Sequence, residues 1–366
     1  MQSRMLKLFF CFFFTVFLLV PCGSVLLQPA AAATAESGSD DAGAVADDSP
    51  AALRKELEQL KDEVQKMHKE ADARKKLEIS PEEKDKSAED ILSSAGRDYT
   101  LMKKGTLGLE YSFSYSYYSG DVIEDSAIVE QRSNHNLTNQ VFVEYALRDN
   151  LTLNTGVPFV YKYNRVGTST AQDATDFGDI TLGVQMQPFK AGGDYPSAIL
   201  TGGFTLPFGT SPYKIVPGEG QATGSGFYAA NAGISLSKTM DPLVAFGNLG
   251  VTYNFAATGL DQNWSDGRNL VEVDPGSSVG VVLGLGYALS YKASLNLSTQ
   301  FSYALGSEYH FSNASTTESG STVSARFNIG TGWKVFKKQS VSVKLGIGLT
   351  SNDPDFTFSV RVPFEF

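Results

Sequence analysis

The sequence contains only two cysteines, Cys11 and Cys22, and both lie in its first segment. The rest of the chain can therefore form neither a disulfide nor a thiol site. Three histidines, scattered along 366 residues, do not make the clustered ligand set that a metal centre needs. The formal net charge of −10 provides no basic surface for phosphate groups. The sequence thus predicts no metal, no other cofactor and no nucleic-acid partner.

Long apolar runs are also missing after residue 27, since no later segment has the ~18 apolar residues that a membrane helix needs. The early run, residues 8–20, follows Arg4 and Lys7 and precedes a group of alanines. This order predicts a signal peptide over residues 1–35, cleaved within residues 30–35. An uncleaved anchor and lipid attachment at Cys22 are the alternatives. If an exported chain without a membrane helix enters a membrane, it must do so as a closed barrel.

The residues after the signal fall into three short regions. Residues 36–50 are small and polar and read as a flexible linker. Residues 51–79 are charged, with apolar residues at alternating spacings of four and three, which predicts a coiled-coil helix. Self-association through this helix and a helix lying against a barrel mouth both remain open. Residues 80–104 are expected to link it to the next region, with a short helix near residues 88–94. The coiled-coil seam comprises Leu53, Leu57, Leu60, Val64 and Met67.

From residue 105 to the end, apolar and polar residues alternate in about a dozen long runs. Leu107, Leu109 and Tyr111 share one face of the first run, while Gly108 and Glu110 share the other. A period of two is typical of strands, because successive side chains point to opposite faces. The predicted strands span residues 105–118, 136–147, 151–163, 177–189, 197–208, 226–237, 243–256, 278–290, 293–305, 322–335, 340–350 and 356–366.

These strands predict an all-β fold, an antiparallel transmembrane β-barrel of about 12 strands over residues 105–366. The runs are longer than the strands of a soluble β-sandwich, the competing fold, and match the ~9–11 residues that a tilted membrane strand needs. Their apolar faces carry no Lys, Arg, Asp or Glu. A basic residue there would cost about 2–4 kcal/mol at mid-bilayer. Short turns alternate with long polar connections, which favours a periplasmic and an extracellular end. The long connections are residues 120–134, 164–175, 209–224, 257–276 and 306–321.

Three segments also carry a family resemblance, which covers roughly residues 105–366. They are Phe177-Gly-Asp-Ile-Thr-Leu-Gly-Val, Gly202-Gly-Phe-Thr-Leu-Pro-Phe-Gly-Thr and Asp241-Pro-Leu-Val-Ala-Phe-Gly-Asn-Leu. They resemble the outer-membrane transporter family associated with the MetA pathway of phenol degradation. The resemblance implies passage of small organic molecules across the outer membrane. The terminal Phe366, with Phe364, also looks like the signal that the barrel-insertion machinery recognises.

The ionisable residues of the strands fall on the polar, inward face. We expect a mixed-charge band in the interior near the first and last strands, and a meeting of Lys162 with Asp179 near the outer rim. Such a band would act as a selectivity filter or would simply fill a narrow barrel with paired charges. The inward charged residues are Glu110, Glu144, Lys162, Asp179, Arg326, Lys334, Lys344, Arg361 and Glu365.

One short motif offers an alternative in a different functional class. His310 and Ser312, two residues apart, resemble the His-x-Ser-Asn motif of outer-membrane lipid hydrolases, in which they would be base and nucleophile. The pair lies in a predicted outer loop, however, and a lone His-x-Ser is common. We therefore expect no enzyme activity.

The sequence as a whole predicts a channel of the bacterial outer membrane for passive passage of small molecules, hydrophobic or aromatic ones among them. Its expected partners are outer-membrane lipid, the barrel-insertion machinery and the solute, and its N-terminal helix would lie in the periplasm. A lipid hydrolase and a structural envelope protein acting through the coiled coil are the alternatives. The identity of the solute stays open.

Overall fold

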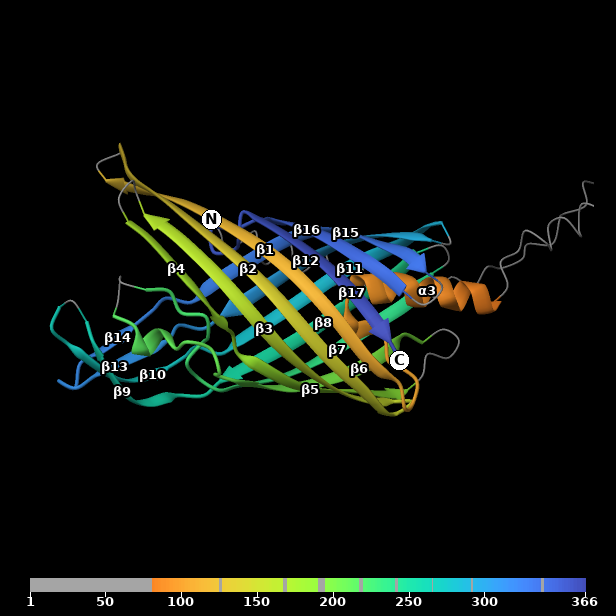
Figure 1. Ribbon diagram of the computed structural model, residues 1–366, viewed down its shortest axis with the longest axis horizontal. Helices are drawn as coiled ribbons and strands as arrows, with labels where there is room; N and C mark the ends of the chain where they lie inside the picture. Colours follow the sequence, from red (N-terminus) through yellow and green to blue (C-terminus); the bar gives the residue numbers. More distant parts are fainter. Residues whose placement is uncertain are drawn as a thin grey trace, which may run out of the picture. The chain divides into compact units, whose positions relative to one another are not determined.

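The computed structural model describes residues 81–124, 127–166, 170–189, 195–216, 220–240, 243–264, 266–290, 292–336 and 339–366. The predicted signal peptide, linker and coiled coil lie outside these residues. Twelve strands form a closed antiparallel ring in the order β1, β2, β3, β5, β6, β7, β8, β11, β12, β15, β16 and β17 (Figure 1). The ring closes between the first and last strands, where Leu107 and Phe366 exchange both backbone hydrogen bonds. The predicted twelve-stranded barrel is confirmed.

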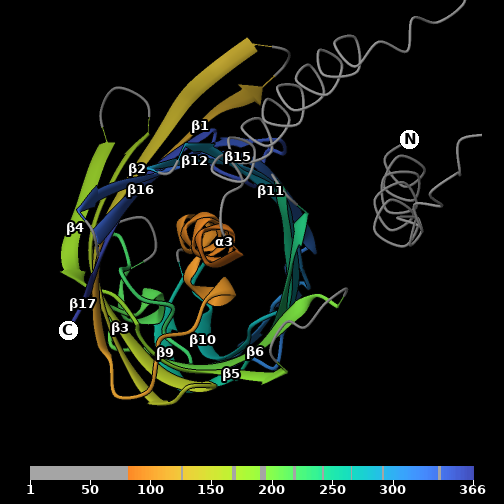
Figure 2. The same ribbon diagram turned by 90° about the vertical axis from the view of Figure 1, so that its right-hand side faces the viewer.

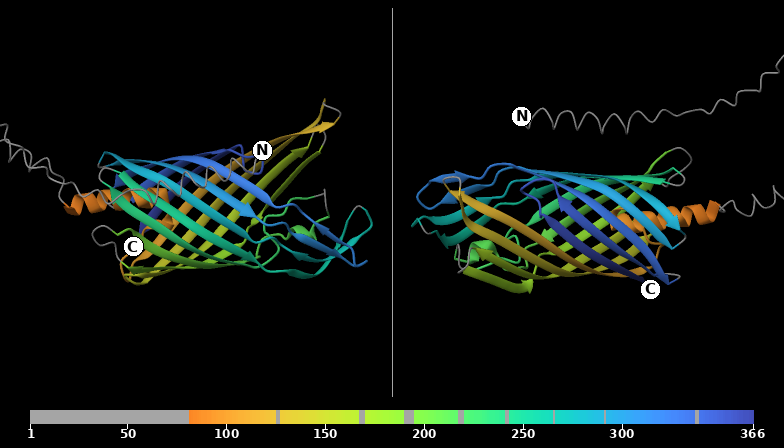
Figure 3. Two further views of the ribbon diagram at one scale, coloured as in Figure 1. Left: turned by 180° about the vertical axis from the view of Figure 1, so that it is seen from behind. Right: turned by 90° about the horizontal axis from the view of Figure 1, so that it is seen from above.

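The ring strands are tilted, long and continuous around the barrel (Figure 3). All twelve predicted strands appear, ten of them within three residues of the expected bounds, while β1 and β2 extend further into the hairpin that joins them. Their bounds are β1 Leu107–Glu124, β2 Ala127–Arg148, β3 Leu151–Val166, β5 Ile180–Phe189, β6 Ser197–Leu206, β7 Ala229–Met240, β8 Leu243–Asn254, β11 Ser278–Ser290, β12 Ala293–Ala304, β15 Thr322–Phe336, β16 Gln339–Gly348 and β17 Phe356–Glu365.

The barrel wall has its apolar side outward. On β5, the apolar Leu182 and Val184 are exposed, whereas the polar Gln185, which points to the other face, is only 5% exposed. The same inversion holds on β12, where Leu297 is exposed and Asn296 is buried. A water-soluble protein would bury these leucines, because each buried one stabilises a fold by about 1.5–3 kcal/mol. The exposed apolar band therefore fits a lipid environment.

The predicted long connections contain extra structure, and the first example is a strand over residues 170–177, most of which falls in the connection predicted over residues 164–175. β4 (Thr170–Phe177) and β5 both pair with β3, and the chain leaves the ladder between them at Gly178 and Asp179. Two of the expected loops form a separate four-stranded sheet in the order β14, β13, β10 and β9. Its strands are β9 Ala257–Asn263, β10 Asn269–Asp274, β13 Glu308–Phe311 and β14 Thr316–Glu318. Residues 257–276 and 306–321 are thus folded rather than open loops.

Two short elements precede the first strand, and a third lies in a long loop. Helix α3 (Pro81–Ala95) contains the predicted short helix and is one turn or more longer at its start. It begins with proline and two glutamates, residues that favour a helix N-terminus. The 3-10 helix η1 (Arg97–Tyr99) follows it, and the 3-10 helix η2 (Pro212–Lys214) lies between β6 and β7. Among the described residues no helix is long and apolar enough to cross a bilayer.

The later part of helix α3 lies inside the barrel, and its start projects from the short-turn end (Figure 3). Figure 2 looks along the barrel from its short-turn end and shows α3 surrounded by the ring of strands. The helix contacts β8, β11, β12, β15 and β16. The four-stranded sheet lies at the opposite, long-loop end (Figure 1). The two ends of the interior are therefore filled by different parts of the chain.

Candidate lumen and its plug segment

One face of α3 packs against the inner wall of the barrel. Ala88, Ile91 and Ala95 recur at spacings of three and four, which places them on one stripe of the helix. Ile91, 2% exposed, packs with Val244, and Ala95 belongs to a cluster with Phe246. We call residues 88–99 the plug segment, because the end of α3 and the η1 turn that follows it contact the inner wall.

Two wall glycines allow the helix to approach so closely. A Cβ atom at Gly286 of β11 would overlap the Ile91 side chain. A Cβ atom at Gly332 of β15 would lie 2.5 Å from Cβ of Ser94, closer than real Cβ atoms come. The wall is thus shaped to receive these two helical side chains. This fit indicates a specific docking site rather than a chance position of the helix.

Polar contacts hold the same face of the helix. The Ser94 hydroxyl lies 2.9 Å from the Ser294 hydroxyl and also accepts a hydrogen bond from the Asn296 side chain. It donates to the Ile91 carbonyl at 2.8 Å. The three residues Ser94, Ser294 and Asn296 are all buried, so these hydrogen bonds satisfy groups that would otherwise be desolvated without partners.

Two cations of the wall bind the carboxyl end of α3. Arg361 on β17 donates to the carbonyl oxygens of Ser93 and Ser94, each at 3.0 Å. Lys344 on β16 donates to the Ala95 carbonyl at 3.4 Å. The last carbonyls of a helix have no partner within the helix and carry partial negative charge, so cations stabilise this end. Arg361 and Lys344 therefore form a receptor for the helix terminus.

Arg97, in η1, contacts acidic side chains of the wall, whereas the end of α3 contacts basic ones. Its side chain lies 3.4 Å from Glu110 and 3.5 Å from Glu144, on β1 and β2. Its guanidinium also lies 3.2 Å from the ring centroid of Phe142. Glu110 is in turn 3.9 Å from Arg361, so the wall charges and the plug charge form one network. Sequence reasoning missed Arg97, because nothing local shows that its segment enters the barrel.

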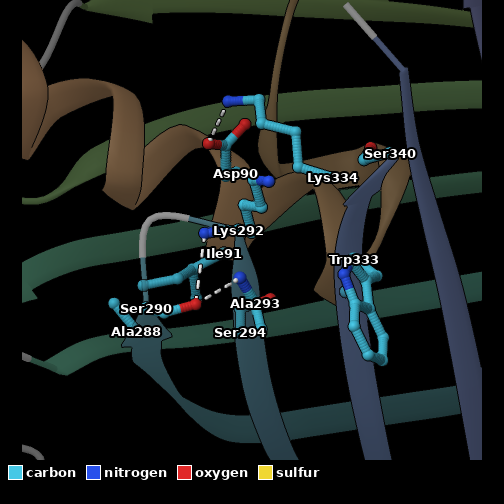
Figure 4. A pocket seen from close by; sticks show the side chains of 11 residues that line it. Asp90, Ile91, Ala288, Ser290, Lys292, Ala293, Ser294, Trp333, Lys334 and Ser340 are labelled. Atoms are coloured by element: carbon cyan, nitrogen blue, oxygen red, sulfur yellow. Dashed lines mark hydrogen bonds and ion pairs between the residues drawn. The ribbon is translucent and has the colours of Figure 1, made fainter. Parts of the chain in front are cut away.

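The remaining plug contacts spread around the ring. Asp90 pairs with Lys334 at 2.7 Å, beside a recess lined also by Ile91 and Trp333 (Figure 4). Asp98 accepts a hydrogen bond from Gln185 at 3.2 Å. The Tyr99 ring meets Phe246 edge to face with centroids 5.0 Å apart, and burial raises the pKa of its hydroxyl.

The long-loop end is held by different contacts. Asp179 accepts hydrogen bonds from the backbone of Gly209 at 3.1 Å and of Ser225 at 2.6 Å. Lys162 donates to the Ala222 carbonyl at 2.6 Å. Asp179 lies close enough to Lys162 to interact with it electrostatically, and both side chains bind the loop between β6 and β7. These bonds explain why the chain leaves the β-ladder at Asp179.

The same loop packs on the four-stranded sheet. Gln262 of β9 donates to the carbonyls of Pro212 and Ile215 at 2.8 and 2.6 Å. Leu270, Val273 and Phe311 form an apolar cluster that also includes Tyr213, Leu260, Trp264 and Tyr309. Burial in this cluster raises the pKa of Tyr213 to about 12.

The predicted inward charges thus separate into groups. Glu110, Glu144, Lys334, Lys344 and Arg361 contact the plug segment or its network. Arg326 binds Asp353 with two side-chain hydrogen bonds near the long-loop end. Glu365 is exposed at the end of β17. The plug segment thus lies among the wall charges that the sequence suggested as a selectivity band.

The hydrolase motif has a different local geometry from the one that catalysis needs. Within the described residues, the ring nitrogens of His310 lie 3.1 Å from Thr316 Oγ1 and 3.1 Å from Asp274 Oδ2. The backbone amide of Ser312 donates a hydrogen bond to the carbonyl of Asn269 at 2.9 Å. A base must reach the hydroxyl it activates, and here His310 makes no hydrogen bond with Ser312. The structure therefore offers no base–nucleophile pair at this motif.

Known proteins resemble this chain in sequence and in fold. Residues 130–366 match the model of the family described as "Putative MetA-pathway of phenol degradation". An outer membrane channel from Pseudomonas putida F1 superimposes with a TM-score of 0.56 at 15% identity, over 74% of this chain and 98% of that chain. The transport unit of the autotransporter AIDA-I from Escherichia coli gives a TM-score of 0.42 at 12% identity, over 78% and 98% of the two chains. The CymD monoaromatic hydrocarbon channel gives 0.36 at 10% identity, over 72% and 88%.

Proposed function

Because this chain belongs to the family described as "Putative MetA-pathway of phenol degradation", we propose that it is a channel of the bacterial outer membrane. It would pass small molecules, hydrophobic or aromatic ones among them, without an energy source. The observation that carries this proposal is a closed barrel with an apolar exterior and a polar interior, such as a lipid bilayer requires. The barrel fold shared with the Pseudomonas putida channel supports it.

The sides of the membrane follow from the two ends of the barrel. Short turns and the carboxyl terminus belong to the periplasmic end, and the long loops with the four-stranded sheet belong to the outside. The plug segment then enters from the periplasm. The preceding coiled coil would lie there too, with Leu53, Leu57, Leu60, Val64 and Met67 as its seam, and Phe364 and Phe366 would serve as the barrel-insertion signal.

The plug segment defines a closed state of this channel. It lies on the buried inner face of β8, β11, β12, β15 and β16, so a solute has to pass it. We infer that the channel conducts when the plug segment leaves its docking site. The wall charges Glu110, Glu144, Lys344 and Arg361 would then face water and act as the selectivity band.

A reversible disulfide bond between the plug segment and the barrel wall tests both the proposed channel and its proposed gating. The hydroxyls of Ser94 and Ser294 lie 2.9 Å apart, so small side-chain rotations would let cysteines at the two positions form a disulfide bond. The chain has no cysteine after Cys22, so a Ser94→Cys/Ser294→Cys protein would form only this bond once the signal is removed. We expect low conductance and slow uptake of small aromatic solutes by proteoliposomes when it is oxidised, and a several-fold rise after reduction. Each single cysteine variant is the control and should not respond to the reductant.

The outcomes separate the two claims. Equal conductance in the oxidised and reduced states would contradict gating by the plug segment and leave the channel standing. No passage of any solute in the reduced tethered protein, in the parent protein and in the single variants would contradict the channel itself.

A further inference from the structure

The four-stranded sheet has two unlike faces. Val273, Tyr309 and Phe311 point to the side that forms the apolar cluster with Trp264. The register places Glu272 opposite His310 and Asp274 opposite Glu308 between β10 and β13. It also places Glu308 opposite Glu318 and His310 opposite Thr316 between β13 and β14. Because opposed residues share a face, four carboxylates and one imidazole gather on the exposed side. The four carboxylates are those of Glu272, Asp274, Glu308 and Glu318.

This charge pattern is unfavourable without a counter-ion. Like charges directly opposite each other across a strand pair destabilise the pair. Asp274, Glu308 and Glu318 lie in one such row across three strands. In the described part of the chain, the basic side chain that Asp274 and Glu308 reach is the imidazole of His310. Arg268 does not relieve them, since it pairs with Asp266 and stacks on Phe311 at the other face. A divalent cation would relieve the repulsion.

The donor atoms have the spacing of a metal site. Nε2 of His310 lies 3.1 Å from Oδ2 of Asp274 and 3.9 Å from Oε2 of Glu308, and one donor atom from each residue lies within 4.8 Å of the others. A tetrahedral ion with bonds of ~2.1 Å needs its ligand atoms about 3.4 Å apart, which lies between the two observed distances. Small side-chain rotations would therefore complete the site.

A second observation concerns the orientation of the histidine. Its Nδ1 lies 3.1 Å from Oγ1 of Thr316, which fixes the ring with Nε2 toward the two carboxylates. Metal-binding histidines characteristically make such a hydrogen bond with the other ring nitrogen. The arrangement thus includes both the ligands and the group that positions one of them.

We propose that Asp274, Glu308 and His310 bind a divalent transition-metal ion of the Zn²⁺ class, with Thr316 as the positioning residue. An imidazole with two carboxylates suits such ions, whereas Ca²⁺ and Mg²⁺ prefer oxygen ligands alone. Water completes the coordination on the exposed side. The ion joins β10 to β13 and so links the two long loops, residues 257–276 and 306–321. This proposal is independent of the proposed channel function.

The test uses the full protein in detergent, without an affinity tag containing histidine. We expect one Zn²⁺ per chain by isothermal titration, and visible absorption bands when Co²⁺ is added. His310→Ala should abolish both signals, while Asp274→Asn and Glu308→Gln should each weaken Zn²⁺ binding at least tenfold. Thr316→Val should weaken it about tenfold, as loss of such a positioning hydrogen bond does. Heat-dependent migration on gels confirms that each variant barrel is folded.

Matched controls make the outcome decisive. A His68→Ala/His135→Ala protein keeps His310 as its sole histidine and should bind Zn²⁺ like the parent. Glu318→Gln, on the same face but outside the three ligands, should change the affinity less than threefold. Absence of Zn²⁺ binding to the parent, unchanged binding by His310→Ala, or equal binding of Ca²⁺ at the same place would overturn the proposal.

Discussion

The two ends of this barrel are filled by different kinds of structure. At the short-turn end a helix brings its own backbone hydrogen bonds and is held by side chains of the wall, such as Arg361 and Lys344. At the long-loop end lies the four-stranded sheet with its aromatic cluster. Each of its two hairpins, β9–β10 and β13–β14, continues into a ring strand at both ends. The helix joins the ring only through the chain before β1. It can therefore leave without breaking a β-ladder, whereas the sheet is tied to the ring by the chain at both ends of each hairpin.

The largest expected effect lies in the sheet. Phe311→Ala removes a nearly fully buried ring from the cluster with Leu270 and Val273, a change that costs about 3–5 kcal/mol. We expect faster cleavage of residues 257–276 and 306–321 in limited proteolysis, with no change in how the plug segment gates conductance. Ser312→Ala, at the exposed neighbour, is the control and should leave the cleavage rate unchanged. A Phe311→Ala protein with altered gating would show that the two ends are coupled.

The next effect concerns the fit between helix and wall. Gly286→Val puts a side chain where Ile91 lies, and such overpacking costs about 1–3 kcal/mol. The plug segment should be displaced, with more open time in single-channel records. Gly280→Ala is the matched control on the same strand, since its nearest neighbour would lie at an ordinary 3.7 Å. Unchanged open time in Gly286→Val would mean that the helix does not need this site.

The receptor for the helix terminus gives a smaller effect. Arg361→Ala removes two hydrogen bonds to the last carbonyls of α3 and also one wall charge near Glu110. Conductance should rise and ion preference should move toward cations, because negative charge then dominates the network. Reversal potentials in unequal salt measure the second change. Equal current and equal ion preference in variant and parent would refute both the receptor and the selectivity band.

The smallest effect is expected from the ion pair between Asp90 of α3 and Lys334 of β15. The Asp90–Lys334 pair is partly exposed, so it contributes no more than about 1 kcal/mol and weakens with salt. Asp90→Lys should raise the open time slightly at low salt, and Lys334→Asp added to it should restore the parent value. An Asp90→Lys effect that the second substitution fails to reverse would show that the pair does not act through charge.

Particular residues show how far sequence reasoning reached. The alternation from Leu107 to Tyr111 predicted β1 and its outward face, because a period of two follows from backbone geometry alone. The helix near residues 88–94 was predicted, but its place inside the barrel was not. Arg97 and Ser94 acquire their roles only from partners about 10 to 200 positions away, Glu110 and Ser294 among them. No local pattern carries that information.

The same limit applies to the long loops. Polar composition predicted exposed connections at residues 257–276 and 306–321, yet short stretches there pair as β10 and β13 around Val273 and Phe311. Strands of four to six residues are too short for periodicity to distinguish them from loop. His310 was singled out with Ser312, two positions away, whereas strand pairing places it beside Asp274.

By itself, the sequence determined the long strands, the face that each turns to lipid and the closed ring that these strands must form. Those properties depend on neighbouring residues and on the need to pair every backbone group within a bilayer. Only the tertiary structure decided that a helix occupies the interior, that Arg361 and Lys344 hold its end, and that Asp274 meets His310. Those contacts join distant segments, and their position depends on how the whole ring closes around the chain.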